Sequence, residues 1–173
     1  MIFMYLIGAF TAFLIIFACY LMHRVSIYKP KTIKVLFKQL TNKNILCPRY
    51  MTPGAAGIDL VSTSMTEKTI NGVKCFTYNL GIAVEIPKGY YGLIGARSNI
   101  CKTGCTLANG VGFIDSDYRG EIKAIFYGKQ PPYKVGERCC QIIIMPYSET
   151  TFIETEKLSE TKRDSGGFGS TGR

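Results

Sequence analysis

Two stretches of the chain concentrate side chains that could do chemistry. In the first, Leu107–Glu121 (LANGVGFIDSDYRGE), the carboxylates Asp115 and Asp117 lie next to Tyr118 and Arg119. Two carboxylates this close can supply a general base, bind a metal ion, or simply provide the polar groups of a turn. The residues alone leave these three interpretations open. The apolar runs on either side of the carboxylates predict that the stretch forms a β-hairpin.

The second stretch is the C-terminal tail at residues 161–173, in which four of the last eight residues are Gly. Such a segment buries too little apolar surface to order itself, so a frayed terminus is the simplest interpretation. Arg163 and Phe168 favour a function instead, because Arg offers a forked donor to phosphate and Phe a face for stacking. The glycines would let backbone N–H groups close around an anion. The tail is not a Walker loop, since it has no Gly-Lys-Ser/Thr sequence.

The elements that must position these stretches are short and rich in β-forming residues. Apolar runs bounded by turn residues predict strands at Thr32–Leu40, Gly81–Ile86, Tyr90–Ala96, Glu121–Tyr127 and Cys139–Met145. The run at Thr32–Leu40 alternates polar and apolar residues, which is typical of a half-buried strand. No long helical period follows residue 40. We therefore expect an all-β barrel or sandwich, with one short helix near Ser98–Cys105.

The N-terminal segment differs from the rest of the chain. The 21 residues from Ile2 to Met22 carry no charge, and as a helix they would span about 32 Å, close to the thickness of a bilayer core. We expect residues 1–22 to form a hydrophobic membrane-anchor helix, with residues 2–22 in the membrane, and residues 23–31 to form a basic linker. Basic residues follow the apolar run, so the body should lie on the cytoplasmic side. The alternatives are a cleaved signal peptide, or a start at Met22 and a cytoplasmic protein.

The net charge of +9 comes mostly from this N-terminal region. Residues 1–58 carry seven basic and no acidic residues, whereas residues 59–173 carry 14 basic and 12 acidic ones, or +2. Because the charges of residues 59–173 nearly cancel, the body is not expected to bind nucleic acid. The single histidine, His23, excludes a Ser–His or Cys–His pair in the body. Seven cysteines, with Cys139 and Cys140 adjacent, favour reduced thiols over a disulfide framework.

Five ordered motifs resemble those of the homotrimeric dUTP diphosphatase (dUTPase) family. They are Ala56–Leu60 (AGIDL), Ala96–Ile100 (ARSNI), Gly112–Gly120 (GFIDSDYRG) preceded by Asn109, Gly136–Gln141 (GERCCQ), and Arg163 followed by Gly166–Gly172 (GGFGSTG). The resemblance runs from about residue 32 to the end of the chain. It implies a jelly-roll-like β-clip barrel over residues 32–160, a flexible Gly-rich motif at 161–173 that closes the active site, and a homotrimer with shared active sites.

The resemblance also implies a reaction. The family hydrolyses dUTP to dUMP and pyrophosphate with Mg2+, which limits uracil incorporation into DNA and supplies dUMP for dTMP synthesis. Asp115 matches the catalytic aspartate that activates a water for attack on the α-phosphate. Asp59 matches a residue that contacts the metal indirectly, through water. The positions that match substrate contacts are Arg97, Ser98, Asn99, Asn109, Gly112, Phe113, Ile114, Tyr118, Gln141, Arg163, Phe168, Gly169, Ser170 and Thr171.

The expected selectivity follows from the same positions. Backbone groups around Gly112–Ile114 and the Asn109 side chain would read the edge of uracil, Tyr118 would exclude a 2′-hydroxyl, and Phe168 would stack on the base. If cytosine were bound instead, buried polar groups would be left unpaired, and this penalty discriminates strongly against cytosine.

Two positions depart from the family pattern. Asn99 stands where a small Ser or Gly is usual, and Asp164 where Gly is common; both adjoin expected phosphate contacts. The alternative functions are a dCTP deaminase, which the YRG sequence and the complete tail disfavour, and a nucleotide-gated interaction protein on the same fold.

Overall fold

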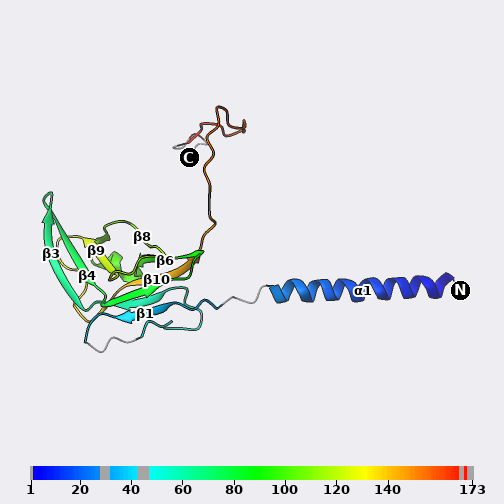
Figure 1. Cartoon of the computed structure of the whole chain (residues 1–173), viewed down its shortest axis with the longest axis horizontal. Coiled ribbons are helices and arrows are strands. Elements are labelled where there is room, and N and C mark those ends of the chain that lie inside the picture. The colour runs from blue at the N-terminus through cyan, green and yellow to red at the C-terminus, as the bar shows by residue number, and fades with distance from the viewer. Residues whose placement is uncertain (1, 28–31, 43–46, 168–169, 171–173) are drawn as a thin grey trace.

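A computed structural model describes residues 2–27, 32–42, 47–167 and 170 of the chain (Figure 1). The N-terminal helix α1 (Ile2–Ile27) precedes a body of short strands and one 3-10 helix. In chain order these are β1 (Leu36–Gln39), β2 (Ile58–Val61), β3 (Ser64–Ile70), β4 (Val73–Asn79), β5 (Ile82–Glu85), β6 (Tyr90–Ala96), η1 (Ser98–Lys102), β7 (Thr106–Leu107), β8 (Gly112–Ile114), β9 (Lys123–Tyr127) and β10 (Arg138–Pro146).

The helix predicted at the N-terminus is present and continues to Ile27. Over the described residues, however, no helix combines the length and the apolar character that a membrane span requires. The prediction that residues 2–22 anchor the chain in a membrane is therefore not supported.

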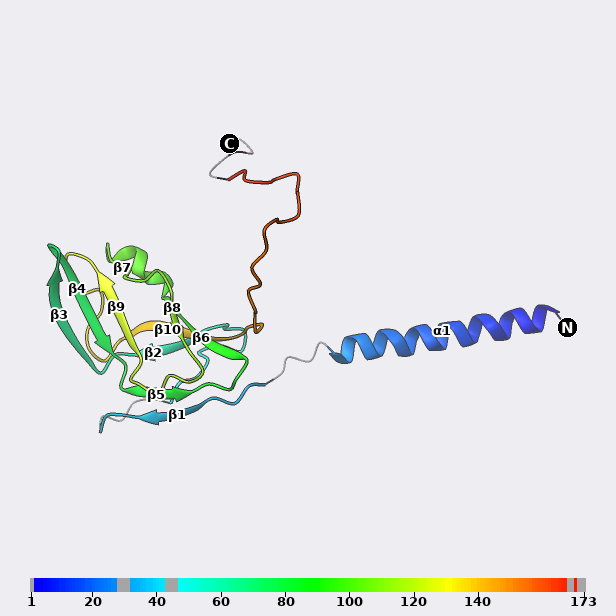
Figure 2. The same cartoon turned by 45° about the horizontal axis from the view of Figure 1, so that its top comes forward.

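The strands form two four-stranded antiparallel sheets and a two-stranded ribbon. The sheet orders are β2-β10-β6-β8 and β3-β4-β9-β7, and the ribbon pairs β1 with β5. Both four-stranded sheets are open, and they pack face to face as in a jelly roll (Figure 2). The predicted all-β class and jelly-roll-like architecture are confirmed.

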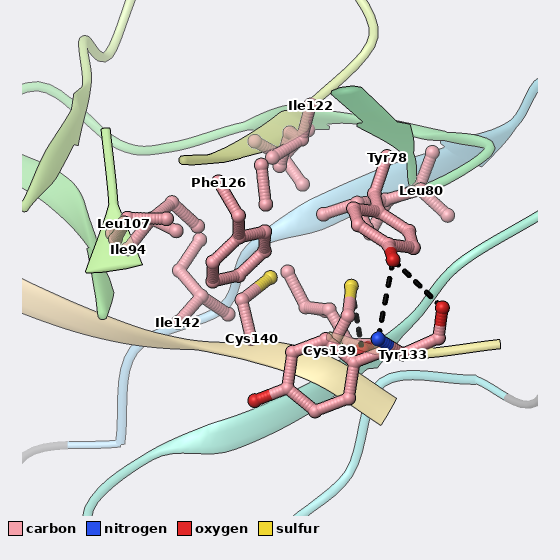
Figure 3. Packing of buried hydrophobic residues seen from close by; sticks show 14 of the residues in the cluster. Tyr78, Leu80, Ile94, Leu107, Ile122, Phe126, Tyr133, Cys139, Cys140 and Ile142 are labelled. Carbon is pink, nitrogen blue, oxygen red and sulfur yellow. Dashed lines mark hydrogen bonds between the residues drawn. The ribbon is translucent and has the colours of Figure 1, made fainter. Parts of the chain in front are cut away.

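The core lies between the two four-stranded sheets. Tyr78 and Phe126 of one sheet meet edge to face at 5.7 Å between ring centroids, and both cysteines of the pair Cys139–Cys140 are fully buried opposite them (Figure 3). A regular strand would place adjacent side chains on opposite faces, but β10 has a β-bulge between Arg138 and Cys140. The bulge allows both thiols to enter the core.

Two expectations about the strands are wrong. Leu107–Glu121 is not a hairpin, because β8 pairs with β6 whereas β9 pairs with β4 and β7 in the other sheet. The chain instead crosses between the sheets, and Asp115 begins the crossing turn. The run Thr32–Leu40 is a strand only over β1, which pairs with β5 and whose four residues are all exposed instead of half-buried.

Candidate functional site

Charged side chains from adjacent strands meet at one end of the β2-β10-β6-β8 sheet. Asp59 of β2 accepts a hydrogen bond from Arg97 Nε through Oδ1 at 3.1 Å and one from Arg138 Nη1 through Oδ2 at 3.0 Å. The register explains the meeting, because Gln141 of β10 lies opposite both Asp59 and Gly95. Asp59 and Gln141 therefore share one face of the sheet, and Arg97 follows directly after the end of β6.

The guanidinium of Arg97 is fixed on two sides. Nε donates to Asp59, and Nη1 donates to the carbonyl oxygen of Arg138 at 3.1 Å. Nη2 has no hydrogen-bond partner among the described residues, so one edge of the planar group remains available to an anion. Gln141 is fixed in a similar way, because its Nε2 donates to the carbonyl oxygen of Ala96 at 3.0 Å. A Cβ at Gly57 would collide with the Gln141 side chain, which explains the glycine of the AGIDL motif.

A cavity of about 480 Å³ opens beside this cluster. Its volume lies in the range of small-molecule sites. Three arginines and two carboxylates line the cavity, so its lining carries a net positive charge and favours an anion. Asp59 offsets part of the charge of Arg97 and Arg138. The lining consists of Cys47, Arg49, Met51, Asp59, Val61, Arg97, Asn99, Tyr133, Gly136, Glu137 and Arg138.

Asn99 is held from within the cavity by a buried tyrosine. The Tyr133 hydroxyl donates to Asn99 Oδ1 at 3.1 Å, which leaves the amide N–H groups of Asn99 unused by this contact. Burial raises the pKa of Tyr133 to about 12, against the opposing effect of Arg97. Tyr133 therefore stays protonated and able to donate at neutral pH. Ser98, the neighbour of Asn99, is exposed at the start of η1.

Replacing Tyr133 with Phe is expected to lower the free energy of unfolding by about 1 kcal/mol at pH 7, the value of one hydrogen bond. Folding raises the Tyr133 pKa from 10.0 to about 12, so the folded state keeps a proton that the unfolded state loses. This stabilisation is complete below pH 10 and is lost as the pH rises toward 12. When the pH is raised from 7 to about 11, the free energy of unfolding should therefore fall less in the variant than in the wild type, as measured by urea unfolding.

Exposed Tyr147 provides the control for this experiment, since Tyr147→Phe should leave the pH dependence as it is in the wild type. A smaller pH dependence should remain in the Tyr133 variant, because burial also raises the pKa of Tyr78. Identical pH dependence in the wild type and Tyr133→Phe would contradict the assignment.

The turn after β8 carries the second group of candidate residues. Asp115 is exposed, and its carboxylate accepts no hydrogen bond from any described residue. The turn itself is well defined, because the backbone N–H of Tyr118 donates to the Asp115 carbonyl at 3.2 Å and the Tyr118 hydroxyl donates to the Glu121 carbonyl at 3.0 Å. A Cβ at Gly120 would collide with the Tyr118 ring, so this position requires glycine.

Asn109 precedes β8, and Gly112 is the first residue of that strand. A Cβ at Gly112 would come within 3.3 Å of the Asn109 amide nitrogen, so the two positions adjoin. Along β8 the side chains alternate: Gly112 faces Ile94 in the core, Phe113 is 63 % exposed against the Tyr91 ring, and Ile114 is partly buried. The structure therefore brings Asn109, the β8 backbone and the Asp115 turn into one continuous segment.

The two groups are not brought together within one copy of the chain. Ile114 pairs with Gly92 near the start of β6, so Asp115 lies beyond Tyr91, whereas Arg97 follows the other end of the same strand. Positions 91 and 97 are six residues apart, which in an extended strand is about 20 Å. A water cannot contact Asp115 while its target is bound at Arg97 of the same copy.

The C-terminal tail leaves the body after β10 and extends away from both sheets (Figure 2). Arg163 Nε donates to the Gly166 carbonyl at 2.9 Å, and the Ser170 backbone N–H donates to the Gly167 carbonyl at 3.0 Å. Asp164 adopts a left-handed conformation with φ of 41°, a conformation that favours glycine. The predicted contacts Phe168, Gly169 and Thr171 lie outside the described residues.

Sequence reasoning missed three residues of the cavity. Arg138 stands inside the GERCCQ motif, but its odd spacing from Gln141 gives no sign in the sequence that the two share a face. Tyr133 and Arg49 belong to no motif, and no signal in the sequence marked them as neighbours of Arg97 or Asn99.

Comparison with known proteins places this arrangement among related chains. The dUTPase family model matches residues 42–172. Deoxyuridine 5'-triphosphate nucleotidohydrolase of Caldanaerobacter subterraneus subsp. tengcongensis is 44% identical over 134 residues, which cover 75% of this chain and 90% of the relative. The Hydrogenobaculum sp. protein of the same name is 41% identical over 143 residues, covering 80% and 98%. A mutant of the Staphylococcus bacteriophage 80alpha dUTPase with dUpNHpp shares the fold, with a TM-score of 0.71 at 22% identity over 82% of this chain and 100% of that one.

Proposed function

The chain belongs to the dUTPase family, and we propose that it hydrolyses dUTP to dUMP and pyrophosphate. The observation that carries the proposal is the placement of Asp59, Arg97 and Gln141 on one face of a sheet, beside a cavity that favours an anion. We assign the catalytic unit to residues 32–160 with the closing tail at 161–173. The reaction would limit uracil incorporation into DNA and supply dUMP for dTMP synthesis.

The triphosphate binds at the charged end of the sheet. Arg97 offers the unused edge of a guanidinium that Asp59 and Arg138 hold in place, and such preorganisation reduces the entropy lost on binding. Ser98, Asn99 and Gln141 supply further donors around the same position. Arg163, Gly169, Ser170 and Thr171 of the tail would then close over the outermost phosphate, and Phe168 would stack on the base.

Asp115 acts as the general base. Its carboxylate accepts a proton from a water molecule while the water oxygen forms a bond to the α-phosphorus. The bond between the α-phosphorus and the oxygen that bridges to the β-phosphate breaks, and pyrophosphate leaves with that oxygen. The role suits Asp115, because its carboxylate is exposed at the end of β8 and has no partner among the described residues.

The segment around β8 selects the base and the sugar. Asn109 and the backbone of Gly112–Ile114 present donors and acceptors to the edge of uracil, and cytosine presents the opposite pattern at its amino edge. Tyr118 lies below the sugar and leaves no room for a 2′-hydroxyl. Its hydroxyl is fixed by the bond to the Glu121 carbonyl, so the ring cannot move aside at low cost.

The residues present fit a Mg2+ ion that is carried by the nucleotide. No group of three or more His, Cys, Asp or Glu side chains forms a metal site within the described part of the chain. Mg2+ is commonly bound through substrate phosphates, one or two carboxylates and several waters. Asp59 would contact it through water, because both of its oxygens bond to arginines yet keep acceptor capacity. When bound, the ion neutralises phosphate charge.

We infer that the active site is shared within a homotrimer. Asp115 lies about 20 Å from Arg97 along β6, so a second copy must bring its own Asp115 to the cavity. The outer face of the sheet continues from Gln141 into an apolar surface at Ile143, Leu93 and Phe113, which lie opposite one another across three strands. A second copy that covers this surface would bury it next to the cavity, and three copies close a ring.

The test is pyrophosphate release by the full chain with dUTP, dCTP, dTTP and UTP as separate substrates. We expect kcat/KM for dUTP to exceed that for each of the other three by about a hundredfold or more, because each competitor clashes with the pocket or leaves polar groups unpaired. Equal turnover of all four, or no turnover of dUTP, would contradict the proposal. Ammonia release from dCTP would identify a deaminase instead.

A further inference from the structure

One cation at the cavity has no role in the mechanism above. Arg49 precedes β2 and lines the cavity together with Arg97 and Arg138. Its side chain is exposed, and it makes no hydrogen bond or ion pair with any described residue. A guanidinium that no described residue pairs with, at the wall of a cavity that favours anions, is placed to bind an anionic ligand.

The two carboxylates of the cavity accept hydrogen bonds from groups other than Arg49. Both oxygens of Asp59 bond to Arg97 and Arg138. Oε2 of Glu137 accepts a hydrogen bond from the backbone N–H of Lys134 at 2.8 Å, inside its own turn. Arg49 is therefore the arginine of this lining whose charge the described residues leave uncompensated. All of its donors are available to a ligand.

We propose that Arg49 binds the triphosphate of the nucleotide as a further substrate-binding residue. The proposal rests on the function proposed above. A guanidinium matches the paired oxygens of a phosphate, and charge-assisted hydrogen bonds of this kind are about twice as strong as neutral ones. Arg49 comes from the segment before β2, whereas the base is read around β8. Its contribution should therefore be common to all triphosphates and should not change the preference for uracil.

Steady-state kinetics with Arg49→Ala test the proposal. We expect KM for dUTP to rise about tenfold or more, because the loss of a hydrogen bond to a charged group weakens binding by that order. The value of kcat should stay within about twofold, and the ratio of dUTP to dCTP turnover should not change. Arg49→Lys, which keeps the charge but not the fork, should show a smaller rise in KM.

Lys129→Ala is the matched control, because it removes an exposed positive charge outside this cavity. It should leave KM within about twofold of the wild type. An unchanged KM in Arg49→Ala would overturn the proposal. So would an equal rise in KM in both variants, since the effect would then be one of net charge. Thermal unfolding of each variant shows that the fold is retained.

Cys47 provides a readout that does not depend on catalysis, because its exposed thiol lines the same cavity. Inorganic pyrophosphate should slow alkylation of Cys47 but not of exposed Cys19, as measured by peptide mass spectrometry. In Arg49→Ala the half-protecting concentration should rise about tenfold. If pyrophosphate protects Cys47 equally well in both proteins, the proposal is wrong. A wild type that shows this Arg49-dependent protection but no dUTP turnover would overturn only the proposed function.

Discussion

Replacing Asp115 with Asn is expected to lower kcat between about a hundredfold and ten-thousandfold, the range that a general base contributes. Asn keeps the shape of the side chain but cannot accept the proton of the attacking water. Nucleotide binding should change little, because the phosphate contacts are made by residues at the other end of β6. Single-turnover kinetics give the rate of the chemical step, and calorimetry with a non-hydrolysable dUTP analogue gives the affinity.

Asp117→Asn is the matched control, since this carboxylate lies two residues away in the same exposed turn. It removes the same charge from the same region and should leave kcat within a few-fold of the wild type. The assignment of Asp115 would be contradicted if its Asn variant kept full activity. Equal losses in the two variants would also contradict it, because they would point to the charge of the turn and not to one base.

Mixing two inactive variants should restore activity if the site is shared. Arg97→Ala removes the phosphate contact of one copy, and Asp115→Asn removes the base of another. Each variant alone should retain less than about one hundredth of the wild-type kcat/KM. In a mixed assembly, an Arg97 from one kind of chain can meet an Asp115 from the other kind. Such a site has both groups and should turn over dUTP at the wild-type rate.

The expected recovery can be counted. If the variants are co-expressed in equal amounts and assemble at random, each half of a site comes from the required chain half of the time, so roughly a quarter of the sites are complete. Each variant expressed alone and carried through the same purification is the control. If verified mixed assemblies recover no activity, both groups must act within one copy. That result would contradict the separation of about 20 Å between Asp115 and Arg97, which lie about six residue positions apart along β6.

The sequence predicted the buried strands best. β6 begins at Tyr90 and ends at Ala96, as predicted, because a continuous apolar run between turn residues is typical of a strand that is at least partly buried along its length. The β3–β4 hairpin was not predicted from the sequence. β3 is almost wholly exposed and rich in polar residues, so hydrophobic patterning carried no signal. Its position is fixed by pairing with β4, which is a tertiary effect.

In the candidate site, too, the sequence predicted some features, whereas others depend on tertiary packing. The motifs gave the positions of Asp59, Arg97 and Gln141, and the structure brings these three together. Motifs carry no distances, so they could not show that Asp115 belongs to a different end of β6. Tyr133 reaches Asn99 from a segment 34 positions away along the chain, and only the packed fold reveals that contact.

The bulge in β10 also explains the spacing of Arg138 and Gln141 in the GERCCQ motif. Arg138 and Gln141 are three positions apart, an odd interval that would put them on opposite faces of a regular strand. Both nonetheless serve the same face, since Arg138 bonds to Asp59 and Gln141 lies opposite it. The extra residue at the bulge restores the parity. If β10 ran through both cysteines without the bulge, the Arg138 guanidinium would face the core, so the doubled cysteine and the bulge must occur together.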